Sequence, residues 1–212
     1  MLSSAAKVLF SKAPNAEARF NKWIFGTMLI AGICALIAAL VLSIEKVHLL
    51  QDPGAKLSCS FNLVLNCSTV MQTPQASVLG FPNSYIGLIA YSMVIVIAVV
   101  GLLGAKLARA FWVEVNAGYL LGVMFAYWLF FQSVFVIQVL CPWCLIVTFT
   151  TTLIFASMTH YNLRKNIFNL KSAQNDKVQA FLKKGYHQLI VASWVVLMIA
   201  LVFVKFGADL FA

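Results

Sequence analysis

The chain has 212 residues, of which 62% are hydrophobic and only 10% are charged, and its mean hydropathy is +0.93. A soluble domain carries about a quarter charged residues, so this composition excludes an ordinary soluble protein and indicates an integral membrane protein. The formal net charge of +9 does not point to nucleic acid as a partner. In a membrane protein, basic residues mainly mark the loops that stay in the cytoplasm.

Five stretches are long and apolar enough to cross a bilayer as helices, which requires about 20 apolar residues and internally satisfied backbone hydrogen bonds. In chain order they are residues 23–44, 85–104, 115–139, 141–161 and 185–204. Residues 1–22 are polar and lack the apolar core and small-residue cleavage site of a signal peptide. The sequence therefore predicts an all-α integral membrane protein.

Lysine and arginine are distributed unevenly among the connecting segments. Twelve of the 15 lie in the arm of residues 1–22, the loop after the second helix and the basic loop of residues 162–184. The other three are Lys46, Lys56 and Lys205. The positive-inside rule places the twelve, and the N-terminus, in the cytoplasm. The loop of residues 45–84 then faces the periplasm, cell exterior or endoplasmic reticulum lumen, where disulfides persist.

The loop of residues 45–84 contains two cysteines, Cys59 and Cys67. In an unbroken helix they would lie about 12 Å apart, too far for a disulfide. Either the backbone between them bends, or one or both pair with a more distant cysteine. The loop is amphipathic, Thr73-Pro74 is typical of a helix start, and Gly80 is typical of a helix end. We therefore expect it to fold over the outer ends of the helices as a lid.

Two further cysteines, Cys141 and Cys144, lie at the bend between the third and fourth helices, and their CxxC spacing is typical of redox sites. Zinc binding and a structural disulfide are the alternatives. Haem attachment would need His where Leu145 stands. A zinc site built from the four cysteines needs thiolates that stay reduced, so the oxidising compartment favours a thiol relay and no metal is expected. Cys34, within the first helix, is expected to be a small packing residue.

Three polar side chains near these cysteines are candidates for contact with a ligand. Gln138 lies three residues before the first cysteine of the CxxC pair. Thr148 lies one helical turn after the second cysteine and on its face. Asn83 directly precedes the second helix. Structural roles are the alternatives: helix-to-helix hydrogen bonding for Gln138, a bond to its own helix backbone for Thr148 and helix capping for Asn83.

These motifs, in this order, resemble the vitamin K epoxide reductase family over roughly residues 23–161. The resemblance rests on Cys59 and Cys67 in the first outer loop, Thr73 six residues later, Asn83-Ser84-Tyr85-Ile86-Gly87 before the next helix, and Cys141-Pro142-Trp143-Cys144 opening the fourth. Other quinone-linked disulfide-forming membrane proteins place CxxC before the widely spaced pair. Here the order is reversed, which favours this family.

The resemblance implies a four-helix transmembrane bundle around a quinone pocket, capped by the cysteine-bearing loop, with a fifth transmembrane helix in residues 185–212. It also implies an order of electron transfer. Cys144 would face the quinone ring with Cys141 as its disulfide partner, Cys67 would exchange with Cys141, and Cys59 would meet an external thioredoxin-fold protein. Either Cys67–Cys141 or Cys141–Cys144 is compatible with this order as the resting disulfide.

The resemblance also assigns the polar candidates. Asn83 would hydrogen-bond a quinone carbonyl, and Thr73 stands where the family has Ser or Thr near the relay. Thr148 stands where vertebrate members carry Tyr, which argues against vitamin K epoxide as the substrate. Gln138 is expected to border the same pocket. With no basic side chain at that depth, the start of the fourth helix is expected to stabilise the thiolate of Cys144.

The sequence thus predicts a membrane oxidoreductase that passes electrons from a DsbA-like thioredoxin-fold protein, through Cys59/Cys67 and Cys141/Cys144, to menaquinone or ubiquinone. The partner is expected to be a separate protein, because the fifth helix of bacterial members is present without their fused thioredoxin-like domain. The expected location is a bacterial inner membrane, with the cysteines on the periplasmic face, rather than the endoplasmic reticulum. The alternatives are a vitamin K epoxide or quinone reductase supplied by reduced thiols, and a non-enzymatic membrane protein with two structural disulfides.

Overall fold

The computed structural model describes residues 16–55, 57–105 and 107–207, and these residues are predominantly helical. Five helices are long and apolar enough to cross a membrane. They are α2 (Ala16–Gln51), α4 (Asn83–Leu102), α5 (Arg109–Phe131), α6 (Pro142–Arg164) and α8 (Tyr186–Phe206). The chain is therefore an all-α membrane protein, as predicted. Most of the predicted N-terminal arm, with Lys7 and Lys12, lies outside the described residues, as do Lys56, Lys106 and residues 208–212.

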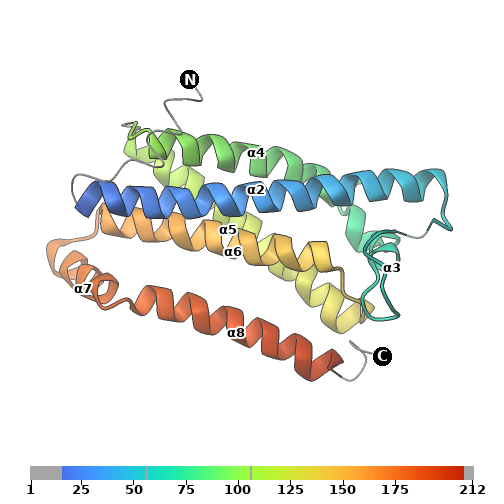
Figure 1. The fold of residues 1–212 in the computed structure, drawn as a ribbon. Coiled ribbons are helices and arrows are strands. Elements are labelled where there is room, and N and C mark those ends of the chain that lie inside the picture. Colours follow the sequence, from blue (N-terminus) through green and yellow to red (C-terminus); the bar gives the residue numbers. More distant parts are fainter. Residues whose placement is uncertain (1–15, 56, 106, 208–212) are drawn as a thin grey trace.

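Helices α2, α4, α5 and α6 form a bundle in which α2 packs against α4 and α6, and α5 packs against α6 (Figure 1). Small residues bring α2 and α4 together, as is common where helices meet in a membrane. The ring of Phe25 on α2 fills the space over Gly101 on α4, where a Cβ atom would overlap it. Phe25 also contacts the rings of Trp112 and Tyr161, at centroid distances of 5.8 and 5.0 Å. These aromatic contacts join all four helices.

Helix α2 is longer than the sequence predicts, because it continues past residue 44 to Gln51. Its 36 residues make a helix of about 54 Å, well beyond the hydrocarbon thickness of about 30 Å. The extension holds the cysteine loop. Glu45 accepts hydrogen bonds from the amide and hydroxyl of Ser58, and the ammonium of Lys46 donates to the carbonyl of Met71 at 2.6 Å.

The third transmembrane segment also differs from its predicted bounds. Helix α5 begins at Arg109, passes into the π-helical turn η2 (Gln132–Ile137) and ends where Gln138 adopts the left-handed conformation with φ of 58°. A π-helical turn changes which side chains face the bundle interior, because it carries more residues per turn than an α-helix.

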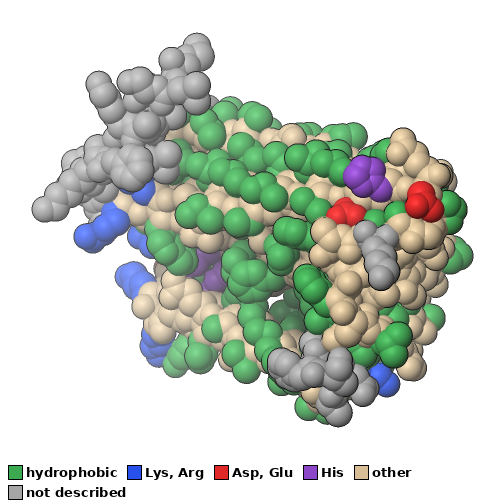
Figure 2. Space-filling model, turned by 45° about the vertical axis from the view of Figure 1, so that its right-hand side comes forward, with side chains coloured by type: hydrophobic (Ala, Val, Ile, Leu, Met, Phe, Trp, Pro, Cys, Tyr) green, Lys and Arg blue, Asp and Glu red, His purple; other side chains and the backbone are tan. Residues whose placement is uncertain are grey.

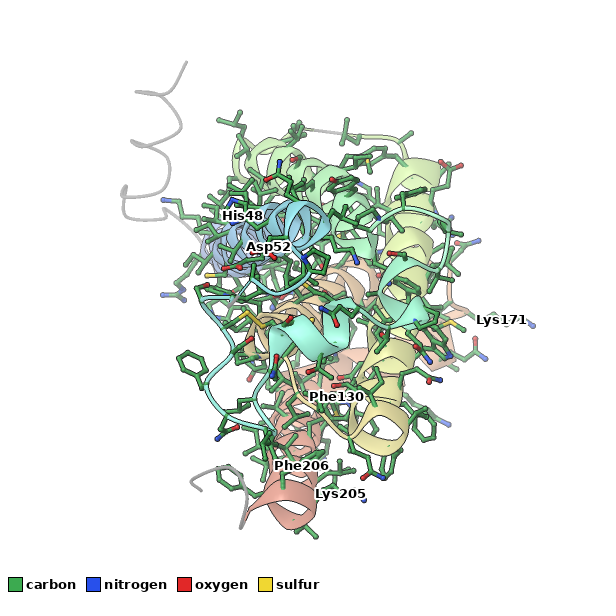
Figure 3. All side chains as sticks on the ribbon, turned by 90° about the vertical axis from the view of Figure 1, so that its right-hand side faces the viewer. His48, Asp52, Phe130, Lys171, Lys205 and Phe206 are labelled. Atoms are coloured by element: carbon green, nitrogen blue, oxygen red, sulfur yellow. A yellow bond between two sulfur atoms is a disulfide. The ribbon has the colours of Figure 1, made fainter. Side chains whose placement is uncertain are left out.

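Two further helices complete the fold on one side of the bundle (Figure 1). The amphipathic helix α7 (Ser172–Lys183) lies near the end of α6, where the amide of Gln179 donates to the carbonyls of Leu163 and Arg164. Helix α8 is mostly exposed. Near the cysteine loop, however, its Phe206 is buried beside Phe130, and Figure 3 shows these two side chains lying close together.

Basic side chains gather at one end of the molecule (Figure 2). The described members of this group are Arg19, Lys22, Arg109, Arg164, Lys165, Lys171, Lys177, Lys183 and Lys184. They lie near the start of α2, α5 and α8 and near the end of α6, whereas the cysteine loop joins the opposite ends of α2 and α4 (Figure 1). The basic residues of this group and the cysteine loop thus lie at opposite ends of the bundle.

Candidate active site

The loop between α2 and α4 bends sharply between Cys59 and Cys67, and these two residues form a disulfide with a Cα–Cα distance of 5.6 Å. Asn62 makes the bend, because its side-chain oxygen accepts hydrogen bonds from the amides of Val64 and Leu65 at 3.0 and 2.7 Å. The sequence left open whether these cysteines pair with each other. They pair because the chain turns back on itself instead of continuing as a helix.

A short backbone pairing attaches this loop to the residue before the CxxC pair. The amide of Asn66 donates to the carbonyl of Leu140 at 2.9 Å, and the amide of Leu140 donates to the carbonyl of Val64 at 2.7 Å. Asn66 also caps helix α3 (Cys67–Met71), accepting a hydrogen bond from the amide of Thr69. The same residue therefore fixes the start of α3 and its position beside Leu140.

This pairing brings sulfur atoms from distant parts of the sequence into contact. The Sγ atoms of Cys67 and Cys141 lie 3.3 Å apart. Both residues are buried, as is Cys59, which is 2% exposed. Cys141 and Cys144 are free thiols, so within the described residues the disulfide is the loop pair Cys59–Cys67. At this distance Cys67 and Cys141 are close enough to exchange through a mixed disulfide.

The first turn of α6 donates a hydrogen bond to the sulfur of Cys141 rather than to that of Cys144. The Sγ atom of Cys141 caps the helix and accepts a hydrogen bond from the amide of Cys144 at 3.3 Å. The hydrogen bond from the Cys144 side chain, aided by the amides of Cys144 and Trp143, lowers the pKa of Cys141 although burial opposes the shift. The sequence predicted that the start of the helix stabilises the thiolate of Cys144. That prediction is wrong, because Cys141 occupies the capping position and its sulfur receives the hydrogen bond.

A cavity of about 510 Å³ lies inside the four-helix bundle and reaches both cysteines of the CxxC pair. Its volume is in the range of small-molecule binding sites, about 300–1,000 Å³. The cavity exists because small residues line it. A Cβ atom added to Gly118 would meet nothing within 4 Å, and one added to Gly122 would meet only Thr151, at 3.9 Å. The walls are mainly apolar, as suits the ring and hydrocarbon tail of a membrane quinone.

Asn83 and Thr73 both line this cavity, and the side chains of both form hydrogen bonds with the backbone of the loop. The amide of Asn83 donates to the carbonyl of Gln75 at 2.7 Å, and its side-chain oxygen accepts from the amide of Val78 at 3.1 Å. Asn83 therefore holds the lid helix η1 (Pro74–Ser77) over the cavity, and the capping position of α4 falls on Pro82. The hydroxyl of Thr73 donates to the carbonyl of Val70 at 2.7 Å.

Thr148 and Gln138 are placed differently. Thr148 lines the cavity, and its hydroxyl donates to the carbonyl of Cys144 at 3.0 Å. Gln138 is exposed and is not part of the cavity wall, because the chain turns left-handed at this residue as it leaves η2. The glutamine that does line the cavity is Gln132, at the start of η2.

Sequence reasoning missed three polar features of the cavity wall. Lys46 lines the cavity, although it was assigned to the outer loop. The hydroxyls of Tyr91 and Thr151 lie 2.7 Å apart in the wall, and the buried hydroxyl of Tyr119 has no partner among the described residues. The seven-residue spacing of the cavity-lining Tyr119, Ala126 and Ser133 on one helix face is the signal that could have found Tyr119.

Metal binding gains no support from this geometry. Among the described residues, no group of three or more His, Cys, Asp or Glu side chains is arranged to hold a metal ion. Two of the four outer cysteines are joined as a disulfide.

Together, a loop disulfide in contact with a buried thiol, and a second thiol on the wall of an apolar cavity within a membrane bundle, define a membrane thiol–disulfide oxidoreductase. The family model described as "Vitamin K epoxide reductase family" matches residues 26–159, more than half of the chain. The chain belongs to the vitamin K epoxide reductase family. It is therefore a membrane oxidoreductase that acts on thiols and quinone, and this family generally works with a thioredoxin-like partner. A comparison with curated proteins gives no match.

Proposed function

We propose that this protein oxidises the thiols of a separate DsbA-like thioredoxin-fold protein and passes the electrons to menaquinone or ubiquinone in the membrane. The observation that carries this proposal is the 3.3 Å contact between the sulfurs of Cys67 and Cys141, beside a cavity that reaches Cys144. It supports a path of electrons from the loop to the cavity. Disulfides made in this way would serve protein folding in the outer compartment.

The proposed relay consists of two thiol–disulfide exchanges followed by reduction of the quinone. The partner's two thiols reduce the Cys59–Cys67 disulfide and leave the partner oxidised. The loop thiols then reduce a Cys141–Cys144 disulfide through a mixed disulfide between Cys67 and Cys141. In the last step the two thiols of Cys141 and Cys144 become a disulfide, and two electrons and two protons pass to the quinone, giving the hydroquinone. The disulfide and thiol pattern of the structure corresponds to the state just before this last step.

The apolar lining of the cavity and its contact with Cys144 support a quinone as its ligand. Thr148 and Cys144 border one part of it, and apolar side chains line most of the rest. Both α4 and α5 line the cavity, while the close helix pairs of the bundle are α2–α4, α2–α6 and α5–α6. The side between α4 and α5 is therefore the route by which we expect a lipid-soluble substrate to enter. Asn83 and Thr73 at the lid are the groups that we propose to border the quinone head.

We propose that the basic end of the bundle faces the cytoplasm and the cysteine loop faces the periplasm of a bacterial inner membrane. The gathering of Lys and Arg at one end (Figure 2) supports this orientation. Residues 23–161 would then be the catalytic core, and residues 162–184 a cytoplasmic loop. The fifth segment, residues 185–212, would return the chain to the outer face.

The decisive experiment follows quinone absorbance with purified protein, a soluble quinone analogue and a reduced thioredoxin-fold partner. Wild-type protein is expected to reduce quinone as the partner is oxidised, and Cys144→Ala is expected to abolish turnover. Cys34→Ala is the matched control, because Cys34 is a free cysteine of α2 outside the cavity, and it should keep wild-type turnover.

Two outcomes would contradict the proposal. If neither quinone nor partner changes while all four outer cysteines remain unreactive, the disulfides are structural. In the second outcome, a DsbA-like protein is never oxidised, and quinone or vitamin K epoxide is reduced only when a strongly reducing partner is supplied. The role of the enzyme would then be to reduce its quinone substrate rather than to oxidise a thioredoxin-fold protein.

A further inference from the structure

A second cavity, of about 350 Å³, lies at the basic end of the molecule, far from the cysteines. It is lined by Arg19, Phe20 and Trp23 of α2 and by Arg164 of α6. About 40 Å of helix separates Arg19 from Lys46, which borders the first cavity. We name these four residues the basic notch, and the quinone relay proposed above does not use them.

The two aromatic residues of the basic notch pack against an imidazole ring. The ring centroid of the buried His160 lies 5.3 Å from Phe20, 6.2 Å from Trp23 and 4.9 Å from His187, the second residue of α8. The notch therefore sits where α2, α6 and α8 meet. A molecule bound there would touch the elements that attach α8 to the bundle.

The two arginines of the notch are available to an anion. The guanidinium of Arg164 lies over the ring of Phe20, 3.9 Å from its centroid, which fixes its position. The nearby carboxylate, Glu17, forms its ion pair with Lys165. Within residues 16–55, 57–105 and 107–207, neither Arg19 nor Arg164 has an ion pair with a carboxylate. Guanidinium groups bind phosphate well, because their N–H groups match its oxygens.

One polar atom of this imidazole has no hydrogen-bond partner among the described residues. The Nδ1 atom of His160 is buried, and no described residue forms a hydrogen bond with it. The residue itself is only 6% exposed. A buried polar atom without a hydrogen bond is costly in a native protein, and the imidazole that carries it packs against Phe20 and Trp23, two residues that line the notch.

We propose that the basic notch binds an anionic phospholipid. Its phosphate would lie between Arg19 and Arg164, which line the notch. Its acyl chains would run along the apolar surface of α8, on which Leu189 and Ile190 are exposed. Trp23, half exposed at the same level, is the residue type that marks the membrane–water interface. A lipid held here would join α8 to α2 and α6.

A soluble phosphate compound shares the headgroup chemistry, and the apolar surroundings favour the lipid. A phosphate ion would use the arginines alone, whereas a phospholipid would also cover the exposed apolar surface of α8. The test therefore includes glycerol 3-phosphate, which carries the headgroup chemistry without acyl chains.

The experiment measures lipid retention and thermal stability of the full chain in detergent. Phosphatidylglycerol or phosphatidylcholine with the same acyl chains is added, and native mass spectrometry counts bound lipid while a thermal scan gives Tm. We expect one retained phosphatidylglycerol per wild-type chain and a rise in Tm of about 3 °C or more. Phosphatidylcholine is expected to give neither.

The variants are Arg19→Gln, Arg164→Gln and, as a matched control, Lys177→Gln on α7, a basic residue of the same end outside the notch. The two arginine variants should retain at least about tenfold less phosphatidylglycerol, as expected for loss of a charge-assisted contact, and the control should match wild type. Arg19 is exposed, so Arg19→Gln provides the test if Arg164→Gln fails to fold.

Equal retention by the arginine variants and wild type would overturn the proposal, because it would show general attraction of lipid to a basic surface. A full rise in Tm with glycerol 3-phosphate alone would also overturn it and would assign the notch to a soluble phosphate compound.

Discussion

At the scale of single residues, Cys141 joins the two halves of the proposed relay. It contacts Cys67 through its sulfur, caps α6 and neighbours Cys144. These contacts lower the pKa of Cys141 although the residue is buried, since the Cys144 thiol and the amides supply hydrogen bonds that water would otherwise give.

The first prediction concerns the titration of Cys141. The Cys144 side chain is the largest cause that lowers the pKa of Cys141, so Cys144→Ala should raise that pKa. Cys144→Ser keeps a hydrogen-bond donor and should raise it less. In a Cys34→Ser background, the ultraviolet absorbance of the thiolate gives the midpoint as pH is varied. The Ser variant is expected to have a lower midpoint than the Ala variant, and equal midpoints for Ala and Ser would contradict this account.

The second prediction tests the cavity through Gly118. Gly118→Leu should place a side chain in the cavity without a clash, because nothing lies within 4 Å of an added Cβ atom. Quinone turnover should fall at least about tenfold, the effect of roughly 1.4 kcal/mol of lost binding, while the fold is retained. Gly26→Leu is the control, since its Cβ atom also meets nothing within 4 Å and it does not line the cavity. Undiminished turnover in Gly118→Leu would place the quinone elsewhere.

The polar residues of the site show which parts of the cavity wall could be predicted from the sequence. Thr148 was predicted to face the pocket because an α-helix places residues four apart on one face, and the structure puts it on the cavity wall. Gln138 was chosen instead for its position three residues before Cys141, and it is exposed and outside the cavity wall. Gln132 lines the cavity in its place, because the π-helical turn η2 and the left-handed residue after it change which side chains face the bundle interior. Such a turn depends on tertiary contacts and leaves no periodic signal in the sequence.

At the scale of helices, the contact between α2 and α4 depends on one glycine. Gly101→Ala would force its methyl group against the ring of Phe25, which is held by Trp112 and Tyr161. The cost of overpacking, about 1–3 kcal/mol, should exceed the gain of up to about 1 kcal/mol in helix propensity. We expect a lower unfolding free energy and a lower Tm.

The matched control for this third prediction is Gly26→Ala, where an added methyl group meets no atom within 4 Å. It should leave the unfolding free energy unchanged or raise it. Gly101→Ala combined with Phe25→Leu should recover part of the loss, because the smaller side chain frees space for the methyl group. A Gly101→Ala protein as stable as wild type would show that α2 and α4 separate without cost.

The existence of all five transmembrane helices followed from hydropathy, whereas their ends did not. The predicted end of the first helix at residue 44 marks where apolar residues give way to Glu45 and Lys46, and α2 continues to Gln51 beyond that point. Hydropathy locates the membrane boundary, but a helix ends where its backbone finds other partners. This difference is also why Lys46 was assigned to the loop and missed as a cavity residue.

At the scale of the whole molecule, the fourth prediction concerns orientation. Asp52 follows the end of α2 near the cysteine loop, and Asp176 lies on α7 at the basic end. In a variant without native cysteines, Asp52→Cys should react with a membrane-impermeant maleimide on intact cells. Asp176→Cys should react only after the membrane is permeabilised. The reverse pattern would contradict the proposed topology.

The family resemblance implied exchange between Cys67 and Cys141, whose sulfurs lie 3.3 Å apart, whereas the residues themselves left the disulfide partner of Cys59 open. Spacing in the sequence allowed Cys59 to pair with Cys67 or with a distant cysteine, since the bend at Asn62 depends on side-chain hydrogen bonds. The contact with Cys141 depends on two backbone hydrogen bonds to Leu140. Such backbone pairing between residues far apart in the chain carries little specific signal in side-chain identity.

The burial of Cys59 has a consequence for which reductants the enzyme would accept. At 2% exposure, its sulfur is shielded from small thiols dissolved in the surrounding compartment. A reductant must first displace the loop that covers the disulfide, and only a macromolecule gains enough contact area to do so. Discrimination between a protein substrate and abundant small thiols would then arise from steric access rather than from reduction potential, which protects the quinone pool from wasteful oxidation of metabolites.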